Sequence, residues 1–227
     1  MSDIIIHPIA HIESDFKEKF GIPRQAGLVD ALEARIVFEP EYRDPEALRG
    51  IEGFTHLWLI WQFSAAVRSD WSPTVRPPRL GGNERMGVFA TRSPFRPNSL
   101  GLSCVRLIRI ESTPEQGSTL IVGGADLMDG TPIFDIKPYI AYADSKPDAR
   151  SGFASNAPEV LKVCIPEEIN QQIPVEKRAA LIGVLSEDPR PRYQHDSERI
   201  YAMSFAGMNV KFRVDNDTVI VTDIEKI

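Results

Sequence analysis

The feature that most constrains the fold is a series of short strand-like segments that fills the first two-thirds of the chain. Each segment is rich in β-branched and aromatic residues, and turn clusters such as ESTPEQGS separate the segments. The helical pattern in this part covers a single turn, at 45–49. Many strands with short turns predict a mainly β fold, a closed or nearly closed antiparallel β-barrel. The expected strands are 4–12, 34–39, 54–63, 87–91, 99–110, 119–125 and 133–140.

The last third of the chain has a different pattern. A polar, turn-rich segment at about 143–157 predicts a linker. Apolar residues at helical spacing predict a helix at 175–186, which Pro174 precedes. We therefore expect two domains, a β-barrel domain at 1–142 and a small α+β domain at 143–227. The expected strands of the second domain are 200–205, 209–214 and 218–224.

Hydropathy and cysteine usage bear on the cellular location. No apolar run approaches the roughly 18 residues that a membrane span needs, and the first residues lack the pattern of a secretory signal. Cys104 and Cys164 lie far apart in the sequence, so we expect reduced thiols rather than a disulfide. These features predict a cytoplasmic protein with no membrane partner.

Charge is distributed unevenly along the chain. The formal net charge is −6, but the segment 68–109 holds eight arginines, no lysine, and two acids, Asp70 and Glu84. This segment therefore carries +6 and the remainder −12. Because guanidinium groups suit bidentate recognition of phosphate or carboxylate, the asymmetry favours an anionic partner. The alternative is a set of surface arginines paired with acids elsewhere in the chain.

Several common motifs are missing. There is no G-x-G-x-x-G after a strand, no G-x-x-x-x-G-K-[ST] and no G-x-S-x-G. The four histidines form no pattern of metal ligands, since even His7 and His11 would stand roughly 13 Å apart on a strand. We therefore expect neither a dinucleotide fold nor a P-loop, and no metal site.

Two segments concentrate residues that could carry chemistry. In GVFATRSPFRPNSLGLS, at 87–103, two prolines stiffen a loop that presents Arg92, Arg96 and Asn98, which favours a functional loop over a purely structural one. In DLMDGTPIFDIKPY, at 126–139, three polar residues alternate with apolar ones along a strand. This polar stripe could bind or transfer protons, or it could be an ordinary cross-strand salt-bridge face. Its members are Asp135, Lys137 and Tyr139.

The motifs PRQAG, TVRPPRLGGN-x-RMGVFATRSPFRPN, DL-x-DGTP, DIKPY and DPRP closely resemble those of the TrmO family, also called TsaA- or YaeB-like. Their order and spacing hold from about residue 5 to the C-terminus. The resemblance implies an S-adenosylmethionine-dependent tRNA methyltransferase whose catalytic domain is a β-barrel. It also implies a homodimer that methylates N6 of threonylcarbamoyladenosine at position 37, beside the anticodon.

The resemblance further implies which residues contact the cofactor. A family His-Gln pair after the long apolar strand is replaced here by Ser64 and Ala65, so part of the cofactor's binding is expected to differ or to be weaker. The family's RPNP-I-G reads RPNSLG, which removes a rigid residue at Ser99. The implied contacts are Pro23, Arg24, Gln25, Ser64, Ala65, Arg92, Leu102, Asp126, Leu127, Met128 and Asp129.

Substrate roles follow from the implied chemistry. The N6 proton must leave for the nitrogen to attack well, and Asp135 or Tyr139 is the hypothetical acceptor. The threonine carboxylate of the substrate requires a cation, for which Lys137 or Arg96 is a candidate. The arginine-rich segment and the DPRPRY motif are expected to contact the anticodon arm. The expected RNA-binding residues are Arg76, Arg79, Arg85, Arg96, Asn98, Arg190 and Arg192.

Other readings of the same residues remain open. The Ser64–Ala65 departure favours a non-catalytic RNA-binding barrel, which would show no binding of the cofactor. A barrel enzyme for a small anionic metabolite would use Arg92, Arg96 and Lys137 to hold its substrate. A structural or regulatory protein with incidental arginines is a further alternative.

Overall fold

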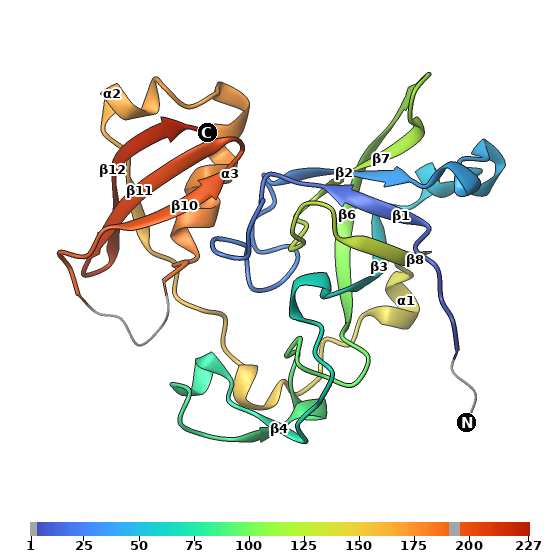
Figure 1. Cartoon of the computed structure of the whole chain (residues 1–227), viewed down its shortest axis with the longest axis horizontal. Coiled ribbons are helices and arrows are strands. Elements are labelled where there is room, and N and C mark those ends of the chain that lie inside the picture. Colours follow the sequence, from blue (N-terminus) through green and yellow to red (C-terminus); the bar gives the residue numbers. More distant parts are fainter. Residues whose placement is uncertain (1–3, 191–195) are drawn as a thin grey trace.

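The computed structural model describes residues 4–190 and 196–227. Six antiparallel strands form a closed barrel in the order β1-β2-β7-β6-β3-β8, and pairing of β8 with β1 closes it (Figure 1). The prediction of a mainly β chain with antiparallel pairing is confirmed. The barrel strands are β1 (Ala10–Glu13), β2 (Glu33–Phe38), β3 (His56–Gln62), β6 (Leu100–Thr113), β7 (Gly117–Gly123) and β8 (Pro132–Pro138).

Alternation of apolar residues determines which side of each strand faces the barrel interior. Along β3, Leu57, Leu59 and Trp61 are buried, whereas the residues between them are partly exposed. Successive side chains of a strand point to opposite faces, so these three enter the barrel core. They pack there with Ile12, Ile36, Val105, Leu120 and Ile133.

Two predicted strands differ from the structure. Residues 4–9 are not part of a strand, and Ile4 is 89% exposed. In the segment 87–91, Gly87 ends the short strand β5, and the residues after it form a 3₁₀ turn, η6 (Val88–Ala90), instead of continuing the strand. The turn forms because the backbone N–H and the hydroxyl of Thr91 both donate to the carbonyl of Val88. The other predicted barrel strands, and the turn at 45–49, agree with the structure to within a few residues.

A long excursion leaves the barrel between β3 and β6. It contains the two-stranded hairpin of β4 (Thr74–Val75) and β5 (Met86–Gly87), which lies beneath both lobes in Figure 1. Its remaining elements are short 3₁₀ turns. These turns are η4 (Ser64–Ala66), η5 (Pro78–Leu80) and η6, while η1 (Pro40–Tyr42), η2 (Pro45–Leu48) and η3 (Ile51–Gly53) lie between β2 and β3.

The C-terminal part forms a second lobe. Its four-stranded sheet has the order β10-β11-β12-β9, in which β9 (Lys162–Cys164) runs parallel to β12. Helix α3 (Val175–Ser186) agrees with the predicted helix, and the three predicted strands are β10 (Tyr201–Phe205), β11 (Met208–Asp215) and β12 (Thr218–Lys226). A shorter helix of this lobe is α2 (Glu167–Asn170), whereas α1 (Ala141–Asp144) lies beside the barrel and η7 (Gly152–Ala154) lies in the segment that connects the lobes (Figure 1).

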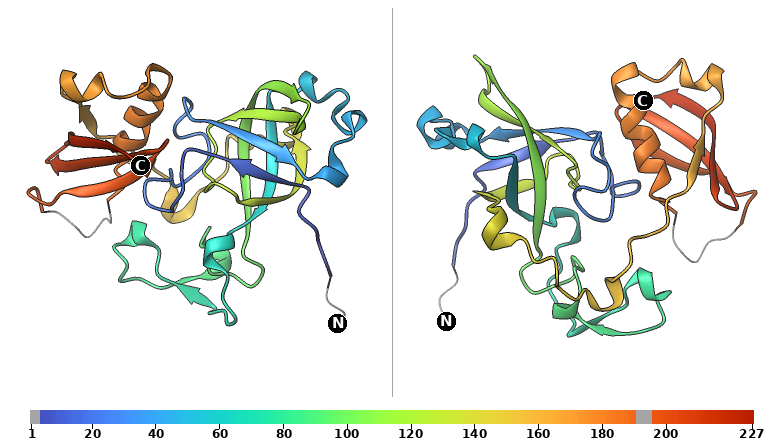
Figure 2. Two further views of the ribbon diagram at one scale, coloured as in Figure 1. Left: turned by 45° about the horizontal axis from the view of Figure 1, so that its top comes forward. Right: turned by 180° about the vertical axis from the view of Figure 1, so that it is seen from behind.

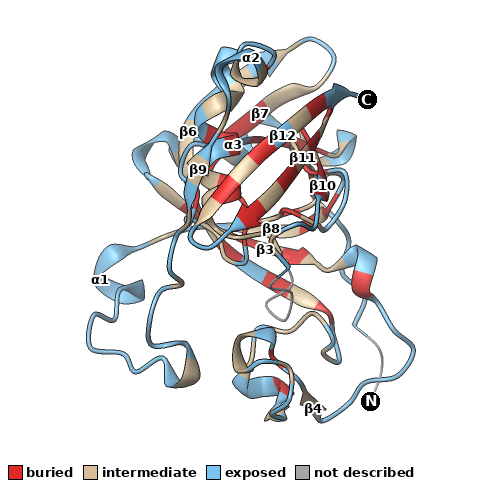
Figure 3. Ribbon diagram, turned by 90° about the vertical axis from the view of Figure 1, so that its left-hand side faces the viewer, coloured by how far each residue is buried: buried red, intermediate tan, exposed pale blue. Residues whose placement is uncertain are grey.

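Each lobe has its own hydrophobic core, and part of the N-terminal chain enters the core of the second lobe. Phe16, Val29 and Leu32, which belong to the loop between β1 and β2, are buried among apolar residues of the C-terminal sheet and α3. This loop fills the space between the two lobes (Figure 2), and buried positions continue through both sheets (Figure 3). The division into domains at residue 142 stays a prediction. No helix in the described part of the chain is long and apolar enough to cross a membrane.

Candidate functional site

The most unusual polar group of the barrel is the Asp126 carboxylate, which lies at the end of the barrel just after β7. Ser103 donates its hydroxyl hydrogen to Asp126 Oδ1 over 2.6 Å. Trp61 donates its indole N–H to Ser103 Oγ over 2.9 Å. Ser103 and Trp61 are buried, so the chain of donors fixes the carboxylate from the core side.

Burial raises the pKa of Asp126 above its ordinary value. Hydrogen bonds from Ser103 and from the backbone of Ala26, together with the positive charge of Arg92, act in the opposite direction. A desolvated carboxylate with one cation nearby is typical of a site that binds a charged ligand.

Arg92 connects the proline-stiffened loop to the loop between β1 and β2. Its guanidinium donates to the side-chain oxygen of Gln25, and the Gln25 amide donates to the backbone carbonyl of Arg24. The loop is held against the barrel because Gly27 N–H donates to Gly124 O over 2.8 Å. The structure thus brings together Gln25, Arg92 and Asp126, which are 67 and 34 residues apart in the chain.

The remaining residues of the 126–129 segment have more structural surroundings. Leu127 is 1% exposed and packs in the barrel core. Asp129 accepts from the backbone N–H of Ser14 at 2.9 Å and from the Lys17 ammonium at 2.6 Å. Hydrogen bonding to Asp129 raises the pKa of Lys17. Asp129 therefore fixes the start of the loop after β1, and Met128 is partly buried beside it.

Asp129-Gly130 forms a turn but not a hairpin. Gly130 has φ +72° and Thr131 N–H donates to Met128 O over 3.1 Å, as in a tight turn. The strands on either side do not pair with each other, however, because β8 pairs with β1 and β3. The turn therefore connects two strands, β7 and β8, that lie on opposite sides of the closed barrel.

Ser64 and Ala65 lie next to the loop between β1 and β2, which we call the N-terminal loop. Both residues are exposed in η4, directly after β3, and Lys19 donates its ammonium N–H to Ala65 O over 2.6 Å. Pro23 is buried, whereas Arg24 is exposed. The departure from the family pattern thus falls on an open edge of the molecule that the N-terminal loop approaches.

The proposed catalytic stripe lies on the outer face of the barrel. Asp135 is opposite Ile60, and Lys137 is opposite Trp58, both of which point away from the core. Lys137 Nζ lies 3.3 Å from Asp135 Oδ2. The Tyr139 ring lies 5.8 Å from the Trp58 ring, centroid to centroid.

Leu102 belongs to this outer face and not to the Asp126 group. It is 59% exposed and lies opposite Ile60, so Leu102, Ile60 and Asp135 form one row across three strands. The next residue, Ser103, points inward to Asp126. The predicted site residues therefore form two groups on opposite faces of the same sheet.

Asp135 and Leu102 of the outer group nonetheless lie near the end of β3 that carries Trp61, whereas Tyr139 lies at its start, where its backbone N–H donates to His56 O. The proline-stiffened loop returns to the barrel at Ser99, whose carbonyl accepts from Phe63 N–H over 2.9 Å. Gln62 pairs with Leu100 and Ile60 with Leu102. The loop bearing Arg92 therefore meets the sheet about two residues along β3 from the Asp135 row, roughly 7 Å at strand rise.

The arginines of the segment 68–109 divide into two sets. Two of them form ion pairs. Arg106 pairs with Asp30, and Arg109 pairs with Glu33 and Glu111. The others form no ion pair with any carboxylate that the structure describes. These are Arg68, Arg76, Arg79, Arg85, Arg92 and Arg96.

Several of the unpaired arginines have neutral partners. Arg79 donates to the backbone carbonyl of Asn156 in the linker, and Arg85 donates to Thr74 Oγ1 over 3.1 Å. Arg96 donates to Thr91 O over 3.2 Å. Asn98 is exposed on the loop. Neutral acceptors leave the charges uncompensated, which suits an anionic partner.

Of the two arginines of the DPRPRY motif that were expected to bind RNA, Arg190 is paired. It donates to both carboxylate oxygens of Asp188, at 2.8 and 3.0 Å, which raises its pKa. Arg24 donates to Arg190 O over 3.4 Å. Arg190 therefore has a structural role in the C-terminal lobe, and Arg192 lies outside the described residues.

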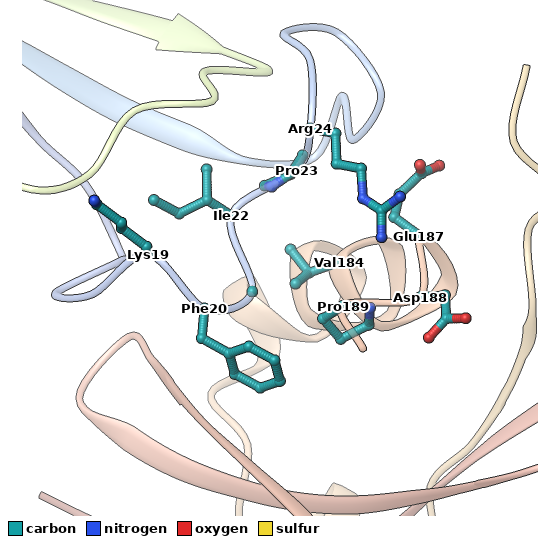
Figure 4. A pocket seen from close by; sticks show the side chains of 10 residues that line it. Lys19, Phe20, Ile22, Pro23, Arg24, Val184, Glu187, Asp188 and Pro189 are labelled. Carbon is teal, nitrogen blue, oxygen red and sulfur yellow. The ribbon is translucent and has the colours of Figure 1, made fainter. Parts of the chain in front are cut away.

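A cavity of about 190 Å³ separates the N-terminal loop from the end of α3 (Figure 4). Lys19, Phe20 and Pro23 line one side, and Val184 and Glu187 line the other. Burial raises the pKa of Glu187, and the nearby charge of Arg24 opposes this shift. Within the described ranges, no three His, Cys, Asp or Glu side chains gather closely enough to hold a metal ion.

Sequence reasoning missed Ser103 and Trp61. Ser103 occupies an inward position of β6 between Gly101 and Val105, and a polar residue at such a position is a signal that could have identified it. Trp61 follows the apolar alternation of β3, so its sequence position indicates only a core residue. Gly101 makes room for it, since a Cβ at Gly101 would come within 2.3 Å of the Trp61 ring.

Comparisons with known proteins match the chain along its length. The model of the tRNA-methyltransferase O N-terminal domain matches residues 11–145, and that of the TrmO C-terminal domain matches 158–227. The tRNA (adenine(37)-N6)-methyltransferase of Escherichia coli (strain K12) is 43% identical over 94% of each chain.

Two further proteins are similar. A protein of Pseudomonas aeruginosa, named putative S-adenosylmethionine-dependent methyltransferase RcsF, is 43% identical over 83% of each chain. A crystal structure of TrmO from Pseudomonas aeruginosa superposes with a TM-score of 0.80 at 33% identity, and covers 99% of both chains.

Proposed function

Because the chain belongs to the tRNA-methyltransferase O family, we propose that it is an S-adenosylmethionine-dependent methyltransferase that modifies N6 of adenosine 37 in tRNA. The threonylcarbamoylated adenosine beside the anticodon is the proposed substrate nucleoside. The observation that carries the proposal in this molecule is the Asp126 carboxylate, held at the barrel end within the electrostatic reach of Arg92.

The residues of this barrel end fit the cofactor's charges. S-adenosylmethionine carries a sulfonium and an ammonium, which require negative charge, and a carboxylate, which requires a cation. Asp126 supplies the first and Arg92 the second. Gln25 is fixed between Arg92 and the Arg24 carbonyl, and its amide adds hydrogen-bonding capacity. Buried support for Asp126 from Ser103 and Trp61 keeps the carboxylate in place.

The cofactor supplies an electrophilic methyl group whose bond to sulfur breaks, with its electron pair remaining on sulfur, as the new bond to N6 forms. Such an in-line displacement depends chiefly on positioning. Arg92, Gln25 and Asp126 orient one reactant. The loop around Arg92 meets the barrel near the Asp135 row, so the nucleoside can approach from the outer face.

The N6 proton has to leave as the nitrogen attacks. We assign its acceptance to Asp135, whose carboxylate is half-exposed on the outer face. Lys137 Nζ lies 3.3 Å from this carboxylate. Tyr139 is the second candidate acceptor. Arg96 and Lys137 are the candidate cations for the threonine carboxylate of the substrate.

The remaining parts of the proposal concern partners and location. Of the six arginines without acidic partners, the five other than Arg92 are proposed to contact phosphates of the anticodon arm. By analogy with the family, the active form is proposed to be a homodimer in the cytoplasm. The Ser64–Ala65 departure affects how tightly the cofactor is held and not which reaction follows.

A direct methylation assay tests this function. The purified full chain is incubated with threonylcarbamoylated tRNA and isotopically labelled S-adenosylmethionine, and the tRNA is digested to nucleosides for mass analysis. One labelled methyl on threonylcarbamoyladenosine is expected. The same tRNA without the threonylcarbamoyl group serves as the matched control. A label on another nucleoside, or no label, would contradict the proposal.

A further inference from the structure

An aromatic pair stands out on the excursion between β3 and β6. Trp71 and Phe89 are 52% and 73% exposed, although large aromatic side chains usually bury most of their area. Their ring centroids are 6.2 Å apart at an interplanar angle of 32°. The two rings therefore form a small exposed apolar surface, which we call the aromatic platform.

The β4–β5 hairpin holds the platform in place. Val88 N–H donates to Pro73 O over 2.9 Å, directly beyond the pairing of Thr74 with Gly87. Val88 itself is 1% exposed, so its side chain anchors the segment while the next side chain, Phe89, points out. The exposure of the rings is thus fixed by a paired backbone and a buried neighbour.

Positive charge surrounds the platform. Arg76 and Arg85 belong to the same hairpin, and neither forms an ion pair with a described carboxylate. Arg68 lies over the Phe95 ring at 3.8 Å from its centroid. A shallow hollow of about 90 Å³ runs from Trp71 to these two residues; its wall also contains Ala66, Ser69, Asp70, Arg96, Pro97 and Ser99.

We propose that the aromatic platform binds unpaired nucleobases of RNA by stacking, while the arginines around it contact the flanking phosphates. Exposed aromatic rings interleaved with basic residues are the chemistry with which proteins bind single-stranded nucleic acid. Asp70 is the acid that faces the hollow, and it leaves the surrounding charge positive. This inference rests on the proposed function, and it identifies unpaired bases as the part of the substrate that the platform contacts.

The place of the platform supports this occupant. Phe89 and Arg92 are three residues apart, so their Cα atoms are at most about 11 Å apart. Arg92 belongs to the proposed cofactor site through Gln25. A base stacked on Phe89 is therefore close in space to the nucleotide that enters the site. The two nucleotides would be near neighbours in the RNA, as the unpaired bases of an anticodon loop are.

Fluorescence titration with a short RNA hairpin tests the platform. The hairpin carries the anticodon-loop sequence with 2-aminopurine at one unpaired position, and an RNA duplex of equal length is the second probe. Trp71→Ala and Phe89→Ala are each expected to weaken hairpin binding roughly 5- to 150-fold, the range for one lost base stack. Duplex binding, which depends on phosphates, should change less than twofold.

Tyr142→Ala is the matched control, because Tyr142 is 90% exposed but lies in α1, outside the excursion. Trp71→Phe should retain most of the affinity. Equal weakening of hairpin and duplex, or wild-type hairpin affinity in both alanine variants, would overturn the proposal. So would a change of oligomeric state on sedimentation with unchanged hairpin affinity, since the platform would then bind a second copy of the chain.

The titration needs no catalysis, so the two proposals can fail separately. Hairpin binding that depends on Trp71 and Phe89, in a protein that transfers no methyl to tRNA, would support the platform and refute the enzyme. Methyl transfer by a protein whose alanine variants bind the hairpin normally would refute the platform alone.

Discussion

At the scale of single residues, the buried end of the barrel depends on one carboxylate and its donors. Asp126 combines desolvation with hydrogen bonds from Ser103 and the Ala26 backbone. Ser103 in turn accepts from Trp61. This chain of donors fixes the position of the carboxylate from the core side.

The raised pKa of Asp126 predicts a pH-dependent stability. Because the folded state holds the proton to a higher pH than the unfolded state, this group contributes stability that is fully present below the unfolded pKa. That stability is lost as the pH rises through the folded pKa. In Asp126→Asn the loss should disappear, so the variant's free energy of unfolding should rise relative to wild type as the pH increases. Urea unfolding at a series of pH values measures this difference; a difference that does not change with pH would contradict the assignment.

Asp135 is expected to act on the rate and not on the binding of the cofactor. Asp135→Asn keeps the size of the side chain but removes the proton acceptor, so single-turnover methylation should fall about 100-fold or more. Affinity for S-adenosylmethionine should stay within twofold. Asp148→Asn, in the exposed linker, is the matched control. Wild-type turnover in Asp135→Asn would remove this residue from the mechanism.

At the scale of elements, α3 shows how tightly the lobes fit. Gly183 lies within α3, where alanine usually stabilises a helix by about 1 kcal/mol. A Cβ there would come within 2.5 Å of Val29 Cγ1, and Val29 is 4% exposed. Gly183→Ala should therefore destabilise the protein by about 1–3 kcal/mol through overpacking.

Val29, the residue that Gly183 contacts, provides the control for this prediction. Val29→Ala removes the obstructing methyl groups, so Val29→Ala/Gly183→Ala should be more stable than the sum of the two single effects predicts. Urea midpoints of the four proteins measure the coupling. Additive effects would mean that the helix and the N-terminal loop are not packed as the structure has them.

The arginine-rich excursion predicts a salt effect. Arg76 is exposed and has no acidic partner among the described residues, whereas Arg109 is paired with Glu33 and Glu111. Arg76→Ala should lower the slope of log K against log salt for tRNA binding by about 1, with a uniform loss of affinity. Arg109→Ala should leave the slope unchanged. Equal slopes in wild type and Arg76→Ala would remove Arg76 from the RNA contacts.

Local pattern predicts the elements better than it predicts their partners. The alternation of β3 and the helical spacing of α3 are properties of neighbouring residues, and both elements were predicted within two residues of their bounds. The segment 87–91 was mispredicted because its β-branched and aromatic content resembles a strand. Its buried Val88 and the bonds from Thr91 instead impose a 3₁₀ turn.

At the scale of the whole molecule, the site is assembled by topology. Gln25 meets Arg92 across 67 residues, where the loop between β1 and β2 meets the excursion before β6. Ser103 meets Asp126 across 23 residues, because β6 and β7 are neighbours in the closed order of strands. Spacing in the sequence cannot supply such contacts. The family resemblance named Gln25, Arg92 and Asp126, but it did not show that Leu102 and Asp135 share the opposite face of the sheet.

The lobes are joined more closely than a division at residue 142 implies. Phe16, Val29 and Leu32 precede most of the barrel in sequence but are buried in the C-terminal core. Composition alone places them in the first domain, because nothing in their local pattern indicates a distant partner. The N-terminal loop that carries Arg24 and Gln25 is therefore held from both sides.

The measurement that tests the account most directly is calorimetric binding of S-adenosylmethionine to the full chain. Wild type should bind one cofactor per chain. Asp126→Asn should bind at least tenfold more weakly, because the carboxylate that faces the cofactor's positive charge is lost. Asp148→Asn should bind as wild type does. Equal affinity in wild type and Asp126→Asn would show that the cofactor lies elsewhere, and would contradict the site described above.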